Sequence, residues 1–456
     1  MAVDEENVRR EKPRPQWLTS VMPASLARKE PAANANPPTN GSPHDANQDY
    51  LTGLRGVLAI MSFLWVFMQT FAPAAVAHSP NDTGPAYQIA LRKSLSVLFW
   101  NDSLIYSSII FLSARTICLP FLLDSTKVQL ASGVFRRGLR LWFPTAVPLI
   151  ICYFVFTKTI GTGYLTTFAN LTSNVSMSDD IYVLPSSLAN FNSIFEIFWT
   201  THTFSYAAGN WAFPTQTLWI VSVLFQQAYT VYATMVVIPY TRKSWRVKGA
   251  FVFIITAWWV YSWAWFSITG LLIADLVVNM DLKARCQSRR GMTLTVALCL
   301  MAAGFAMQFL WVTAYPNLYD AEIDYHTGLY NTGGVYTWND ATAPQLRADD
   351  YLTIVGFYIL LESSDIMQKI FRNPVFVFLG KRSFAYFLLQ SIIVYTLGIK
   401  TALKMMNGSL DDYAHATGVV FITTLLVTIA AGEVFYWLIE KPSQKFAHIL
   451  FAWIRE

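Results

Sequence analysis

The stretch YLTGLRGVLAIMSFLWVFMQTF, Tyr50–Phe71, opens the apolar part of the chain and sets an arginine at its start. Arg55 stands between Gly53 and Gly56, and the run that follows it is uncharged. Such a run predicts a membrane-spanning helix, which needs about 20 apolar residues. Burying a charged side chain in a membrane costs free energy unless an oppositely charged or hydrogen-bonding partner compensates the charge. We therefore ask what Arg55 pairs with or binds.

The composition assigns the whole chain to the same class. Of 456 residues, 54% are hydrophobic and only 13% are charged, whereas soluble proteins carry about 25% charged residues. We expect an all-α, polytopic membrane protein with about ten transmembrane helices. The expected spans are 54–76, 104–124, 141–158, 215–239, 249–266, 267–281, 292–313, 351–366, 379–402 and 415–438.

Charged loops and glycosylation signals predict the orientation. Basic residues cluster at 127–140, 242–248, 283–290 and 369–382, and such clusters mark cytosolic loops. Asn-x-Ser/Thr sequons fall in the intervening, lumenal loops, apart from Asn40 in the tail. Together they predict a multi-pass protein of the eukaryotic secretory pathway, a glycoprotein with both ends in the cytosol. The loop sequons are at Asn81, Asn101, Asn170, Asn174 and Asn407.

The chain divides into three parts. Residues 1–49 are rich in Pro, Asn and charged residues and predict a disordered cytosolic tail. Residues 50–445 form the membrane domain, and residues 446–456 a cytosolic carboxyl-terminal tail. Two polar segments, 159–214 and 314–350, are expected to be lumenal, with an interfacial stretch at 186–202.

Ionisable residues inside the spans are the candidates for chemistry, because such residues are rare in membranes without a function. Either arginines and carboxylates pair across helices, or the arginines face a cavity and bind an anion such as phosphate, whose oxygens the guanidinium fork matches. Both interpretations stay open for Arg55 and for Arg115. The set is Arg55, Arg115, Asp275, Glu362, Asp365 and Glu433.

Histidine is scarce, and none falls in the middle of an expected span. His202, in TTHTFS before the fourth span, is the preferred general base, because a neutral imidazole can take a proton from an alcohol. An ordinary loop histidine is the alternative interpretation. No Cys/His cluster predicts a metal site, and no motif predicts binding to nucleic acid.

The order of several motifs resembles the integral-membrane acyltransferase 3 family, in its fungal-type branch. That family's membrane domain begins with Asp-Gly-Leu-Arg-Gly, and residues 52–56 here read TGLRG. The resemblance covers about residues 50–445. Later segments similar to the family's motifs are IIFLSA at 109–114, FRRGLRLWFP at 135–144, TLWIVSV at 217–223, FLGKRSFAY at 378–386 and EKP at 440–442.

The resemblance implies an activity and a set of residues. Members of the family move an acyl group, often acetyl, from acyl-CoA to a hydroxyl of a sugar, lipid or secondary metabolite. It implies that Arg55 belongs to the catalytic core. From the chemistry of the residues, and not from the resemblance, we expect Arg115 to hold the donor, acetyl-CoA, together with Arg55, and His202 to act as the base. The expected partners are acyl-CoA, a hydroxyl-bearing acceptor (a glycan or secondary metabolite) and the lipid bilayer.

Three departures from the family pattern open an alternative. The family's catalytic histidine lies eleven positions after the arginine, where this chain has Val66. Thr52 replaces the first aspartate, and the segment VLFQQ at 223–227 has no acid where the fourth helix of the family carries one. Valine accepts no proton. The alternative is therefore a catalytically silent relative that acts as a membrane partner subunit or binds a lipid or acyl donor.

Overall fold

The computed structural model describes residues 48–79, 81, 83–177, 181–200, 204–319 and 344–455. The predicted tail up to residue 47 lies outside the described residues, as do His202 and most of the acidic segment 314–350.

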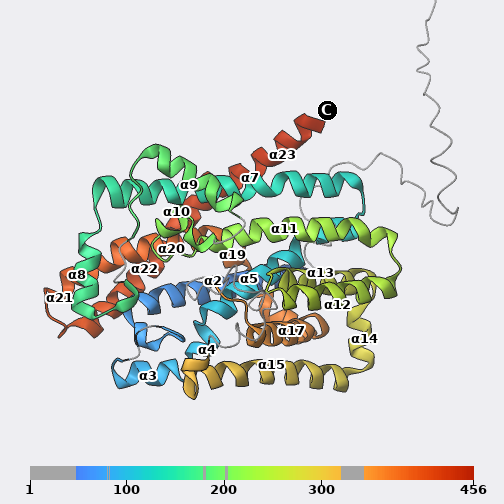
Figure 1. The fold of residues 1–456 in the computed structure, drawn as a ribbon, viewed down its shortest axis with the longest axis horizontal. Coiled ribbons are helices and arrows are strands. Elements are labelled where there is room, and N and C mark those ends of the chain that lie inside the picture. Colours follow the sequence, from blue (N-terminus) through green and yellow to red (C-terminus); the bar gives the residue numbers. More distant parts are fainter. Residues whose placement is uncertain are drawn as a thin grey trace, which may run out of the picture. The chain divides into compact units, whose positions relative to one another are not determined.

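The described residues form helices and no strand (Figure 1). The longer helices are α2 (Asp49–Phe71), α5 (Asp102–Ile117), α7 (Lys127–Cys152), α9 (Ser187–Trp199), α11 (Trp219–Val237), α12 (Lys243–Trp259), α13 (Ala264–Asn279), α15 (Arg290–Thr313), α17 (Ala348–Ser363), α20 (Ser383–Ile393), α22 (Tyr413–Phe435) and α23 (Lys441–Arg455). The shorter ones are α3 (Ala86–Arg92), α4 (Ser96–Phe99), α6 (Leu119–Leu123), α8 (Gly163–Thr172), α10 (Ala208–Trp211), α14 (Leu282–Ser288), α18 (Asp365–Phe371), α19 (Pro374–Lys381) and α21 (Ile399–Met406).

Seven helical stretches within the described part of the chain are long and apolar enough to cross a membrane, and an eighth qualifies if α13 and α14, bent by 81°, are counted as one span. A polytopic membrane protein is therefore supported. All ten expected spans overlap helices, but α12, α13 and α17 have only 17, 16 and 16 residues. The seven stretches are Asp49–Phe71, Ser96–Leu123, Lys127–Thr159, Trp219–Tyr240, Arg290–Thr313, Ser383–Met406 and Tyr413–Arg455.

Two helix boundaries differ from the expected ones. The third span begins at Lys127 rather than at residue 141, because Thr126 caps α7 by accepting a hydrogen bond of 3.3 Å from the Gln129 amide. The arginines predicted in a loop are thus helical. At the other end, a π-helical turn (Tyr436–Glu440) joins α22 to α23, so helix continues to Arg455 where a tail was expected.

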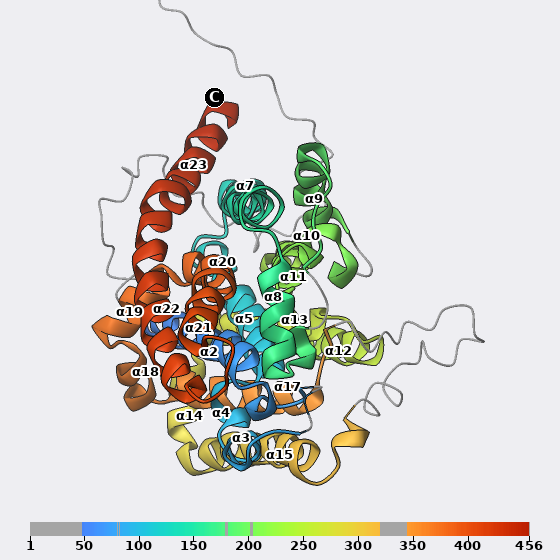
Figure 2. The same ribbon diagram turned by 90° about the vertical axis from the view of Figure 1, so that its left-hand side faces the viewer.

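Helix α2 lies inside the bundle and contacts α5, α18, α19 and α20. Figures 1 and 2 agree that α2 and α5 lie between α7 on one side and α15 on the other. The two glycines beside Arg55 explain the close approach of α18 and α19. A Cβ atom on Gly53 would stand 1.7 Å from the Phe371 carbonyl oxygen, and one on Gly56 would stand 2.2 Å from that of Phe376. The contact therefore fixes where Arg55 sits in the bundle.

Candidate functional site

Two cavities lie along helices α2, α5 and α11. One, which we call the basic cavity, has a volume of about 400 Å³ and is lined by Arg55, Arg136, Arg137, Arg140 and Glu440, among others. The other, the aromatic cavity, has a volume of about 430 Å³ and is lined by Trp65, His78, Tyr106, Trp219, Trp263 and Tyr319, among others. Both volumes lie in the range of small-molecule sites.

The arginines of the basic cavity come from two helices. Arg55 belongs to α2, and the other three belong to α7. Residues one helical turn apart share a face, so Arg136 and Arg140 project in one direction. The Arg55 guanidinium donates a hydrogen bond of 2.7 Å to the Thr116 hydroxyl. Arg137 donates one of 2.9 Å to Ser113. Side chains of α5 thus orient two of the four guanidinium groups.

Charge in the basic cavity is unbalanced. Within the described part of the chain, none of the four arginines has a carboxylate in ion-pair distance. Glu440 is the one carboxylate among the lining residues. Its Oε1 accepts a hydrogen bond of 3.2 Å from Gln444. Four cations facing one anion in a confined space favour an anionic ligand, and guanidinium groups match phosphate oxygens in pairs.

Arg115 does not line the basic cavity. Its guanidinium lies 2.9 Å from the Glu362 carboxylate, and both side chains are 1% exposed. The Tyr50 hydroxyl donates a second hydrogen bond, of 2.7 Å, to the same carboxylate. Arg115 is thus held in a buried ion pair, which is the structural alternative for this residue. Two other carboxylates of the predicted set have different partners, because Asp275 pairs with Arg246 and Glu433 with Arg382.

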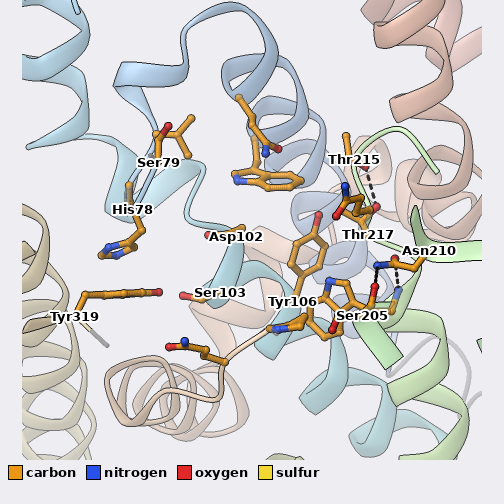
Figure 3. A pocket seen from close by; sticks show the side chains of 18 of the residues that line it. His78, Ser79, Asp102, Ser103, Tyr106, Ser205, Asn210, Thr215, Thr217 and Tyr319 are labelled. Atoms are coloured by element: carbon orange, nitrogen blue, oxygen red, sulfur yellow. Dashed lines mark hydrogen bonds between the residues drawn. The ribbon is translucent and has the colours of Figure 1, made fainter. Parts of the chain in front are cut away.

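The aromatic cavity has a stacked pair at one end (Figure 3). The His78 ring lies on Tyr319 with centroids 3.5 Å apart, and the Arg347 guanidinium lies 3.7 Å from the Tyr319 centroid. Burial, together with Arg347 and Arg92, holds the pKa of His78 well below 6.5. His78 is therefore neutral at pH 7 and can accept a proton. In the sequence, nothing distinguishes His78 from the other histidines near the ends of the spans.

Several buried polar atoms of the aromatic cavity have no hydrogen-bond partner among the described residues: Trp65 Nε1, Gln69 Oε1, the Tyr106 hydroxyl and Ser205 Oγ. Buried polar groups in native proteins nearly always have partners, so a cluster of unsatisfied ones needs an explanation. Donors and acceptors set among aromatic faces suit a ligand with hydroxyl groups and a flat or ring-shaped body. Asp102 is the only carboxylate among the residues that line this cavity.

The two cavities approach each other at the middle of α2. Ser62 lines the basic cavity, and Trp65, one turn further along, lines the aromatic cavity. On α5, Tyr106 lines the aromatic cavity and Ile109 the basic one. A wall about one helical turn thick therefore separates them. Tyr106 was not among the residues selected from sequence, because a single tyrosine in an apolar run carries no signal of its own.

The three site residues predicted from sequence lie in different surroundings. Arg55 lines the basic cavity, Arg115 is in an ion pair, and His202 lies outside the described residues. Val66, at the position of the family histidine, has 0% exposure and lines neither cavity. Compared with known proteins, the chain matches no protein-family model, no curated protein and no solved structure.

Proposed function

We propose that the protein is an integral-membrane acyltransferase that moves an acyl group from acyl-CoA, with acetyl-CoA as donor, to a hydroxyl of a glycan or secondary metabolite. One observation carries the proposal: two cavities of different chemistry run along the same helices and approach each other at Ser62 and Tyr106. Transfer between two substrates needs such a meeting point, because reaction requires the two reacting atoms about 3–3.5 Å apart.

The basic cavity suits the donor. CoA carries its negative charge on phosphates at one end and its thioester at the end of a long, flexible arm. Arg55, Arg136 and Arg137 would bind the phosphates, and the arm would extend along α2 toward Ser62. In this proposal the basic cavity opens to the cytosol, where acyl-CoA is found, and the aromatic cavity opens to the lumen.

The aromatic cavity suits the acceptor. Its hydroxyl oxygen attacks the thioester carbon, so a C–O bond forms, the C–S bond breaks, and CoA leaves as the thiol. The hydroxyl proton needs an acceptor. His78 is our candidate, because its imidazole is neutral and lines the cavity. His202, outside the described residues, is the second candidate base.

A silent relative remains the second hypothesis, and Val66 favours it. This residue is buried and unable to accept a proton at the position where the family has its histidine. Under this hypothesis the basic cavity still binds acetyl-CoA, but no acetyl group is transferred.

Transfer of labelled acetyl from acetyl-CoA by the purified protein separates the two hypotheses. We expect wild type to label an acceptor from a panel of glycans and hydroxylated metabolites, with transfer reduced in His78→Ala. If transfer is lost in His202→Ala but not in His78→Ala, the base is His202. Binding of acetyl-CoA without transfer to any acceptor would favour the silent relative.

A further inference from the structure

Tyr106 occupies the wall between the two cavities. Its ring packs edge-on against Trp65 and Trp219, with centroids 5.6 Å away in each case. Phe387 borders it on a third side, with a centroid distance of 6.4 Å. Aromatic rings in such T-shaped contacts hold one another in a preferred geometry. The ring is therefore fixed, and the direction of its hydroxyl is fixed with it.

The Tyr106 hydroxyl is available as a donor. It is buried, and no group among the described residues accepts its proton. One hydroxyl from each cavity, Ser62 of the basic cavity and Thr217 of the aromatic cavity, lies close enough to donate a hydrogen bond to the Tyr106 oxygen, which leaves the Tyr106 proton free. Figure 3 shows the Tyr106 ring between the His78–Tyr319 stack and the Thr215–Thr217 pair.

Neighbouring polar groups at the wall are already engaged. Ser62 accepts a hydrogen bond of 2.6 Å from Gln390 Nε2. Thr217 is bonded to Thr215 at 3.0 Å, and Thr215 to Ser391 at 2.7 Å. These bonds tie α2 and the segment before α11 to α20. The Tyr106 hydroxyl has these groups as neighbours but no acceptor for its own proton among the described residues. It is therefore an available hydrogen-bond donor on a rigidly held ring, and such a donor stabilises charge without reorganising.

We propose that the Tyr106 hydroxyl donates a hydrogen bond to the carbonyl oxygen of the acyl donor and stabilises the negative charge that forms there during transfer. This inference rests on the proposed function, which brings the thioester to the wall. When the acceptor oxygen attacks the carbonyl carbon, the carbonyl electrons move onto that oxygen. They return as the C–S bond breaks, the acceptor's proton ends on the CoA sulfur, and Tyr106 keeps its own proton throughout.

Steady-state kinetics of the Tyr106→Phe variant test whether this hydroxyl stabilises the carbonyl oxygen during transfer. Loss of one such donor lowers kcat by about 100- to 1,000-fold in other enzymes, and we expect a loss of that order with KM for acetyl-CoA little changed. Tyr358→Phe is the matched control, because the Tyr358 hydroxyl is also buried and without a partner among the described residues but lines neither cavity. We expect kcat of the control to equal that of wild type.

A binding measurement separates this role from the proposed function. Acetonyl-CoA keeps the carbonyl but cannot transfer its acyl group, whereas propyl-CoA lacks the carbonyl. We expect wild type to bind acetonyl-CoA about 3- to 10-fold more tightly, the worth of one hydrogen bond, and Tyr106→Phe to bind both alike. If Tyr106→Phe still binds acetonyl-CoA more tightly than propyl-CoA, or if its kcat equals that of wild type, the role of Tyr106 is overturned. The proposed function would not be affected by either result. Wild type that binds neither analogue and transfers nothing would overturn the proposed function, and this inference with it.

Discussion

Arg55 donates a hydrogen bond of 2.7 Å to Thr116 and has no ion pair among the described residues. Arg115, on the neighbouring helix, has the opposite arrangement, because its charge is neutralised by Glu362 at 2.9 Å. The charge of Arg115 is thus neutralised within the bundle, whereas that of Arg55 has no carboxylate partner among the described residues. This contrast between two arginines in adjacent spans leads to separate predictions for each.

We expect Arg115→Ala to lower the stability of the fold by about 3–5 kcal/mol, because it leaves the Glu362 carboxylate buried without a partner. Unfolding in detergent, followed by denaturant titration, measures the change. Lys283→Ala is the control, since its partner Asp365 is 70% exposed and exposed pairs contribute about 0–1 kcal/mol. If folded Arg115→Ala binds acetyl-CoA more weakly than wild type, Arg115 instead takes part in binding the donor, as the sequence suggested.

Alanine at Gly53 or Gly56 should strongly destabilise the protein, because its methyl group would overlap backbone atoms of α18 and α19. A large fall in the yield of folded, monodisperse protein is the expected result. Gly418→Ala provides the comparison within a membrane helix, since nothing lies within 4 Å of a Cβ atom there. Equal tolerance of all three substitutions would mean that α2 and α19 are further apart than described.

His78 predicts the pH dependence of transfer. Only the neutral imidazole accepts a proton, and its pKa in the folded protein lies well below 6.5 because of burial and of Arg347 and Arg92. The acid limb of kcat/KM should therefore lie below pH 6.5, where a free histidine would already be half protonated. We expect this limb to vanish, with the activity greatly reduced, in His78→Gln. An acid limb at or above pH 6.5 in wild type would contradict the assignment of His78 as a neutral base.

Sequons divide into accessible and buried ones. Asn170 and Asn407 are exposed, at the ends of the contacting helices α8 and α21. The Asn174 amide instead donates hydrogen bonds of 3.1 and 3.0 Å to the Gln69 and Thr70 carbonyls, and its side chain also bonds Asn81 at 3.2 Å. A glycan on Asn174 would break these bonds.

We therefore expect glycosidase-sensitive mass shifts that disappear in Asn170→Gln and Asn407→Gln and persist in Asn174→Gln. Because the two exposed sequons share one end of the bundle, shifts at both would place that end in the lumen. Absence of any glycan in a eukaryotic host would remove one of the two arguments for the predicted orientation.

The helices and the position of Arg55 follow from local sequence, because hydropathy and the position of a charge within an apolar run are local properties. The partner of Arg115 does not, since Glu362 lies 247 residues away and only helix packing brings it close. The charge rule places the three arginines of α7 in a cytosolic loop. The helix begins at Lys127 rather than at residue 141, so these arginines are helical and line the basic cavity. His78 and Tyr106 are inconspicuous in sequence and gain meaning only from the rings and cavities around them.

Calorimetric titration of the purified protein with acetyl-CoA tests the central claim, that the basic cavity is the donor site. Arg55→Ala and Arg137→Ala should raise the Kd by about 10- to 100-fold, the effect of losing a hydrogen bond to a charged group. Arg242→Ala, an exposed arginine that lines neither cavity, should leave Kd unchanged. Equal affinity in wild type, Arg55→Ala and Arg137→Ala, or no binding by wild type, would contradict the account.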